Sequence, residues 1–177
     1  MSVQVRPVAP DLMRNFMYIF NDVLDLESIE SYKNTIATHF SKMLQEKHDY
    51  FQFYPTRNFR LTLNDPAVNT IKDHIEKRVR VKLTCYEIEL QTWAIGIEST
   101  LHNHNDPGRG HGDYNSLLYL NDDFDGGEFF TEDGLFLKPK TNMLTFFNGK
   151  DIGHGVKKVS RNHRYTMILW WKNTQFY

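Results

Sequence analysis

The hydrophobic positions of this chain change their spacing near residue 80. Before that point, residues 27–44 place apolar side chains three and four residues apart, which predicts an amphipathic helix. A second helix is predicted over residues 67–78, because Asp65 suits the N-cap position and Pro66 the first turn. The first half of the chain is therefore expected to be mainly helical.

Short apolar runs flank these helices and dominate the rest of the chain. In the first half they predict strands at residues 16–20 and 59–63. After residue 80, turn residues separate further runs with the pattern of strands; they cover residues 81–94, 114–120, 128–131, 135–137, 142–147, 153–159 and 165–171. We expect the 128–131 and 135–137 segments to form a hairpin.

About eight short strands behind two helices are typical of a jelly-roll or cupin-like barrel. We therefore predict an α+β, mainly β fold. The length of 177 residues suits a single domain over residues 1–177. In this division residues 1–80 form a helical buttress and residues 81–177 the strand-rich core.

The overall charge narrows the classes of partner. A net charge of −1 argues against a broad electrostatic surface for nucleic acid or membrane. No stretch approaches the ~20 apolar residues that span a bilayer. The first residues, MSVQVRPVAPDLMRNF, lack the apolar run of a signal peptide. The single cysteine, Cys85, has no partner for an internal disulfide, which favours a reducing, cytoplasmic location.

The densest group of candidate metal ligands is the run LHNHNDPGRGHGD at residues 101–113. His104 and Asp106 are two residues apart, so on a strand both side chains point to one face. With the distant His154 they can form the 2-His-1-carboxylate set of non-haem Fe(II) oxygenases. His102 with His104, and His111 with Asp113, have the same spacing, so spacing alone does not select the ligands.

Arg164 is a candidate anion-binding residue directly before the last predicted strand, and it continues the alternation of that strand. It shares one strand face with Thr166, Ile168 and Trp170, and both faces are otherwise apolar. The strand is therefore expected to be covered on both sides. A buried guanidinium needs a partner, and its parallel donors suit a carboxylate.

Several motifs in the second half of the chain combine into a specific pattern. They are His104-Asn105-Asp106, the run DYNSLLYLN ending at Asn121, DFDGGEF ending at Phe129, His154-Gly155-Val156 and Arg164-Tyr165-Thr166. Over about residues 81–171 the chain resembles the 2-oxoglutarate- and Fe(II)-dependent dioxygenases, in their prolyl-4-hydroxylase-like branch. The resemblance implies a double-stranded β-helix core, with supporting helices contributed by the N-terminal half.

The resemblance also implies roles for individual residues. The family's strand pattern aligns with residues 113–121, which favours His104, Asp106 and His154 as the Fe(II) ligands over the other equally spaced pairs. Arg164 matches the residue that pairs with the distal carboxylate of 2-oxoglutarate, and Tyr119 matches a tyrosine that hydrogen-bonds the same group.

Other positions have more than one interpretation. Thr166, two residues after Arg164, would point the same way and add a hydroxyl to the co-substrate site. Tyr119 is equally well explained as a core aromatic residue. Trp93 stands near a position where relatives carry a site-lining tyrosine, which leaves substrate- or oxygen-side contacts open. His111 lies either in a surface loop or in a lid over the substrate.

The implied activity is hydroxylation of a peptidyl residue with Fe(II), 2-oxoglutarate and O2, releasing succinate and CO2, with ascorbate as a candidate reductant. A peptide or protein is the expected substrate, and proline is the residue that the nearest pattern suggests. A free amino acid or other small molecule remains an alternative, and the neutral charge disfavours nucleic acid. Two other classes stay open: a non-catalytic cupin-like metal-binding domain, and a zinc protein that uses His102, His104 and His111.

Overall fold

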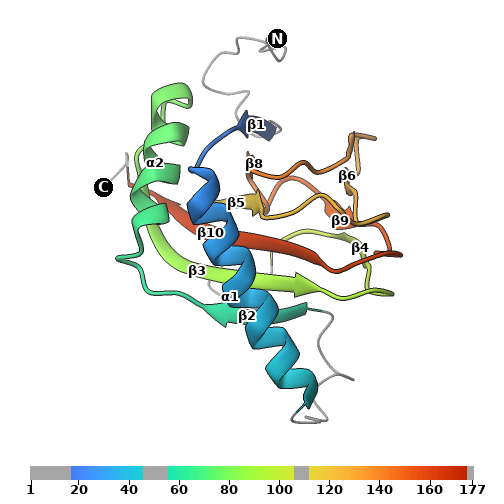
Figure 1. Ribbon diagram of the computed structural model, residues 1–177. Coiled ribbons are helices and arrows are strands. Elements are labelled where there is room, and N and C mark those ends of the chain that lie inside the picture. Colours follow the sequence, from blue (N-terminus) through green and yellow to red (C-terminus); the bar gives the residue numbers. More distant parts are fainter. Residues whose placement is uncertain (1–16, 46–55, 106–111, 175–177) are drawn as a thin grey trace.

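The computed structural model describes residues 17–45, 56–105 and 112–174, and within them two antiparallel sheets lie behind two helices (Figure 1). The large sheet has the order β1 (Met17–Asn21), β8 (Met143–Phe147), β5 (Tyr114–Tyr119), β10 (Arg164–Asn173), β3 (Leu83–Trp93) and β2 (Thr56–Arg60). The small sheet has the order β4 (Ser99–His102), β9 (His154–Val156), β6 (Phe129–Thr131) and β7 (Phe136–Leu137). The helices are α1 (Leu26–Gln45) and α2 (Pro66–Arg78).

Strands that are distant in sequence are neighbours in both sheets. β10 lies between β5 and β3, and β9 lies between β4 and β6. The two sheets enclose a set of apolar side chains that includes Leu117 and Ile168 from the large sheet and Phe129 from the small one. This is a double-stranded β-helix, and the predicted α+β, mainly β fold is confirmed.

Both helices pack on the outer face of the large sheet, where α1 crosses β10, β3 and β2 in Figure 1. α2 begins as predicted, because the Asp65 carboxylate accepts a hydrogen bond of 3.0 Å from the Ala67 amide. Ile36 of α1, with Ile71 and Ile75 of α2, is fully buried against the sheet. Neither helix combines the length and the apolar character that crossing a bilayer requires.

The central strand β10 separates two clusters of apolar side chains. Met167 and Leu169 point towards the helices, whereas Ile168 lies in the cluster between the sheets. Arg164 and Thr166 share the face of Ile168, since side chains alternate along a strand. The predicted coverage of both faces is therefore confirmed.

The clearest departures from the predicted elements are at β2 and β4. β2 covers Thr56–Arg60 rather than residues 59–63, and its pairing with β3 fixes this register. β4, at Ser99–His102, lies in a segment with no predicted strand. The N-terminal half also contributes β1 and β2 to the large sheet, and the assignment of residues 1–177 to one domain stays a prediction.

Candidate metal and co-substrate site

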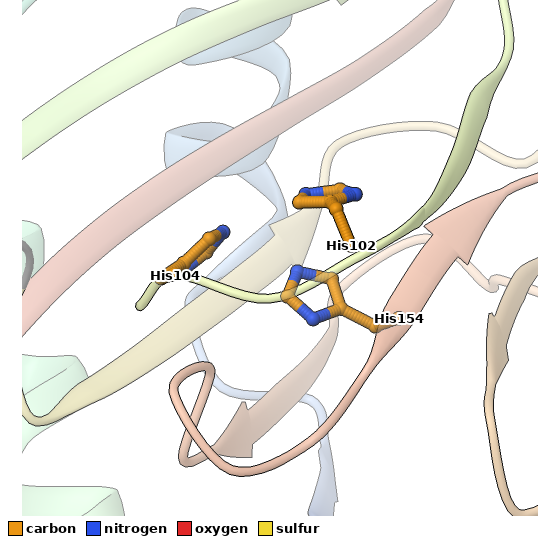
Figure 2. A group of neighbouring side chains, drawn as sticks. All are labelled: His102, His104 and His154. Atoms are coloured by element: carbon orange, nitrogen blue, oxygen red, sulfur yellow. The ribbon is translucent and has the colours of Figure 1, made fainter. Parts of the chain in front are cut away.

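Three histidines meet at the edge of the small sheet (Figure 2). His102 ends β4 and is the cross-strand partner of His154, which begins β9. His104 follows two residues after β4, where its amide donates a hydrogen bond of 2.8 Å to the Gly149 carbonyl. One ligand nitrogen from each ring lies within 4.8 Å of the other two. The cluster contains two of the predicted metal ligands, His104 and His154, together with His102.

Hydrogen bonds fix the rings of both predicted histidine ligands. The Nδ1–H of His154 donates to the Ile152 carbonyl oxygen at 2.9 Å. His104 is held in the same way, with Nδ1 2.9 Å from the side-chain oxygen of Asn115. With Nδ1 as the donor, each ring keeps a lone pair on Nε2, which is the arrangement that metal-binding histidines adopt.

Burial keeps one of these rings neutral. His154 is 5% exposed, and burial lowers its pKa to about 3. The neighbouring His104 and His102 lower this pKa further, because a second positive charge nearby is unfavourable. A neutral imidazole is the form that coordinates a metal ion. His104 is half-buried and His102 is exposed, so the cluster opens to solvent on the side of His102.

Arg164 lines the same cavity as the three histidines. Its side chain is fully buried, and its three guanidinium nitrogens have no hydrogen-bond partner among the described residues. The guanidinium carbon lies 5.1 Å from the centre of the Tyr119 ring and 5.3 Å from that of the Trp93 ring. Burial lowers the pKa of Arg164. A buried cation without an anion is unfavourable, so this position suits an anionic ligand.

The predicted co-substrate residues converge around this guanidinium. Thr166 is the cross-strand partner of Tyr119 and shares a strand face with Arg164. Both hydroxyls are fully buried and, within the described residues, have no hydrogen-bond partner. Three unpartnered polar side chains in an apolar interior fit a carboxylate, which accepts several hydrogen bonds at once.

One cavity of about 290 Å³ connects the histidines with Arg164. This volume is at the small end of ligand pockets. Its described lining consists of Gln91, Trp93, Ser99, His102, His104, Leu117, Phe129, Phe147, His154, Val156, Arg164, Ile168 and Trp170. The site thus offers a cluster of imidazole nitrogens at one position and a cation without a counter-ion at another. Apolar side chains line the cavity between them.

Not every predicted site residue can be placed. Asp106 and His111 lie outside the described residues, so ligation by Asp106 and a lid function for His111 stay predictions. Trp93 does line the cavity, with an indole nitrogen that has no partner among the described groups. Asn148 is part of a turn, where its side chain bonds Asp151.

Sequence reasoning overlooked two residues that hold His104. Asn115 bonds its Nδ1, and Gly149 packs so closely that an added Cβ would meet both His104 and Asn115. The alternation of side-chain directions along β5 could have indicated from the sequence that Asn115 faces the site. Gly149 carried none, because a glycine after a strand usually marks a turn.

This combination of enclosed sheets, clustered histidines and a buried arginine is that of a double-stranded β-helix with an internal ligand site. Residues 90–172 match the profile of the 2OG-Fe(II) oxygenase superfamily. The resemblance expected from the sequence is thereby confirmed over the strand-rich half of the chain.

Curated relatives share shorter segments. Prolyl 3-hydroxylase 2 of Mus musculus is 49% identical over 65 residues, which cover 33% of this chain and 9% of that protein. Prolyl 3-hydroxylase 1 of Rattus norvegicus is 32% identical over 106 residues, which cover 54% of this chain and 14% of that protein. The chain therefore spans only about a tenth of the length of these relatives.

Solved structures share the fold over most of the chain. A viral collagen prolyl hydroxylase from Paramecium Bursaria Chlorella virus-1, in its 2OG complex, aligns with a TM-score of 0.70 at 12% identity, covering 91% of this chain and 97% of that one. A prolyl hydroxylase from Trichoplax adhaerens, in complex with a hypoxia inducible factor peptide fragment, gives 0.67 at 17% identity, with coverages of 89% and 83%. A Pseudomonas putida prolyl-4-hydroxylase gives 0.64 at 15% identity, with coverages of 88% and 91%.

Proposed function

We propose that this chain is an Fe(II)- and 2-oxoglutarate-dependent dioxygenase that hydroxylates a prolyl residue in a peptide. The observation that carries the proposal is the shared cavity of His104, His154 and Arg164, in which the arginine is fully buried and uncompensated. A dicarboxylate co-substrate would offer one carboxylate to the guanidinium and leave the other for the metal ion. Bound iron supplies the oxygen activation that no side chain of the chain can provide.

In this proposal the side chains of the site bind the metal ion and 2-oxoglutarate and orient them. His104 and His154 would hold the metal, with Asp106 as the predicted third ligand, and Asn115 and the Ile152 carbonyl keep the two imidazole rings in their orientation. Arg164 receives the distal carboxylate of 2-oxoglutarate, with the hydroxyls of Tyr119 and Thr166 as further donors. Phe129, Phe147 and Ile168 exclude water from the space between these two sets.

The peptide substrate is supported by the names of the relatives, which are prolyl hydroxylases, and by the structural neighbour that carries a peptide. A free amino acid or small molecule is the alternative substrate. A cytoplasmic location stays a prediction that rests on the single Cys85, and ascorbate as a reductant also stays a prediction.

Anaerobic addition of Fe(II) and 2-oxoglutarate tests the co-substrate site directly. We expect a weak visible metal-to-ligand charge-transfer band, which His154→Ala abolishes. Release of succinate with proline-containing peptides, free proline and nucleic acids then tests the substrate. A folded, metal-loaded protein without the band would contradict the proposal and favour a non-catalytic cupin-like domain.

A further inference from the structure

We propose that Thr145 is a positioning residue of the co-substrate site: its hydroxyl donates a hydrogen bond to the Tyr119 oxygen, which directs the Tyr119 proton to the ligand carboxylate. The inference rests on the proposed function only in requiring a carboxylate beside Arg164. Thr145 is the one polar residue of β8, whose sequence is MLTFF. Strand formation does not require a hydroxyl at this position, so its presence needs another reason.

The alternation along β8 places Thr145 on the inner face of the large sheet. Phe147, two residues later, lies in the apolar cluster between the sheets, whereas Leu144 and Phe146 lie in the cluster beneath the helices. Thr145 therefore points to the same side as Phe147, which lines the cavity. Its cross-strand partner Leu117 also lines the cavity.

The Thr145 hydroxyl is next to another buried hydroxyl. Thr145 and Tyr119 are both fully buried, and neither side-chain oxygen has a hydrogen-bond partner among the described residues. Tyr119 is two residues from Leu117 on the same face of β5, so it is the diagonal neighbour of Thr145. Burial raises the pKa of the Tyr119 hydroxyl, and the neighbouring Arg164 and Thr145 lower it. The two hydroxyls thus form one polar position in an apolar interior, where unpaired polar groups are unfavourable.

The order of the strands fixes the order of the hydrogen bonds. β5 lies between β8 and β10, and neighbouring strands are about 4.8 Å apart, so Tyr119 stands between Thr145 and Arg164. A carboxylate only accepts hydrogen bonds, so the phenol must spend its single proton on the ligand. The phenol oxygen then accepts from Thr145, and the two hydrogen bonds strengthen each other in this dry interior.

Thr92 provides a matched control for Thr145. It is also fully buried, and its hydroxyl also lacks a partner among the described residues. Its neighbours on β3, Gln91 and Trp93, line the cavity, so Thr92 points to the opposite face. Thr145→Val and Thr92→Val therefore remove the same kind of group from opposite sides of one sheet. Both variants should unfold at or above the temperature of the wild type, because each loses an unpaired buried hydroxyl.

Isothermal titration of 2-oxoglutarate into the Co(II)-loaded protein compares these variants. Co(II) replaces Fe(II), because it binds the same types of ligand and is stable in air. We expect Thr145→Val to weaken the affinity for 2-oxoglutarate by about 3–10-fold, as for the loss of one hydrogen bond. Thr92→Val should stay within about twofold of the wild type. Thr145→Ser keeps the hydroxyl and should also stay within about twofold, whereas a loss equal to that of Thr145→Val would show that shape matters and overturn the inference.

A double-mutant cycle with Tyr119→Phe tests the route through the phenol. If Thr145 acts through Tyr119, Thr145→Val should change the affinity by less than about twofold once the phenol is absent. The same fold-loss in both backgrounds would overturn the inference, and so would wild-type affinity in Thr145→Val. Either result would leave the proposed function standing. A wild type that binds Co(II) but not 2-oxoglutarate would contradict the proposed function, and this inference with it.

Discussion

Arg164 faces Trp93 across the β10–β3 pair, and its guanidinium carbon lies 5.3 Å from the centre of the indole ring. An aromatic face attracts a cation, worth about 2 kcal/mol when the pair is desolvated. That attraction does not replace an anion, because the guanidinium nitrogens still have no hydrogen-bond partner among the described residues. The residue is thus held in position for a ligand.

The first prediction is that Arg164→Met abolishes 2-oxoglutarate binding without destabilising the ligand-free protein. A buried charge without a partner is unfavourable, and apolar replacement of buried charges is often neutral or stabilising by about 1–4 kcal/mol. Thermal unfolding with and without 2-oxoglutarate measures both effects. At 100 times its dissociation constant, the ligand should stabilise the wild type by about 2.7 kcal/mol and the variant not at all.

Arg161→Met is the matched control for that experiment. Arg161 is exposed and pairs with Asp125 at the surface, where an ion pair contributes about 1 kcal/mol or less. This variant should keep the full stabilisation by 2-oxoglutarate. An equal loss in both variants would mean that the effect does not come from the cavity.

A second prediction concerns the support of His104. In Gly149→Ala, the new methyl group would meet the His104 ring and the Asn115 side chain, so their hydrogen bond cannot keep its geometry. We expect the affinity for Co(II) to fall by about 10–100-fold while the circular dichroism spectrum is unchanged. Gly134→Ala is the comparison, since nothing lies within 4 Å of its added Cβ. Its positive φ of 88° makes it lose about 1–2 kcal/mol of stability but no metal affinity.

Cys85 should be a slow nucleophile. Burial raises the pKa of its thiol to about 11, so at pH 8 only about one thiol in a thousand is the reactive thiolate. Alkylation by iodoacetamide, followed by intact mass, should therefore be roughly a hundredfold slower than for an exposed thiol. The rate should rise with pH up to about 11. A rate that levels off near pH 8.5 would contradict this environment.

The N-cap of α2 gives a prediction about stability alone. Asp65 accepts hydrogen bonds from the Ala67 amide and from the Tyr32 hydroxyl of α1, so it links the two helices. Asp65→Ala should lower the free energy of unfolding in urea by about 1–2 kcal/mol. Asp73→Ala, at an exposed position within α2, should change it by less than about 0.5 kcal/mol. Equal effects would indicate that Asp65 does not act as a cap.

The apolar periodicity predicted most elements because those elements have one buried face. α1 and α2 follow it closely, and Asp65-Pro66 marks the start of α2. β4 was not predicted for the opposite reason. Three of its four residues, including Leu101 and His102, are exposed, so no hydrophobic pattern distinguishes it from a loop. The strand that places His102 opposite His154 is therefore the one least visible in the sequence.

The histidines of the site show a similar limit. His102 and Asp106 are each two residues from His104, so periodicity treats them alike. The spacing also gives no sign that His102 pairs with His154, a contact between residues more than fifty positions apart. Arg164 could be predicted, because a charge inside an otherwise apolar strand is conspicuous. Its lack of a partner becomes visible only when the surrounding strands are in place.

The alternation along β10 has a practical consequence for redesign. Side chains facing the helices, such as Met167 and Leu169, pack in the core beneath the helices, while those on the other face, such as Ile168 and Trp170, line the cavity. Libraries restricted to the second face would diversify co-substrate or substrate preference on a constant framework. Substitutions on the two faces of this strand would therefore change protein stability and ligand selectivity separately.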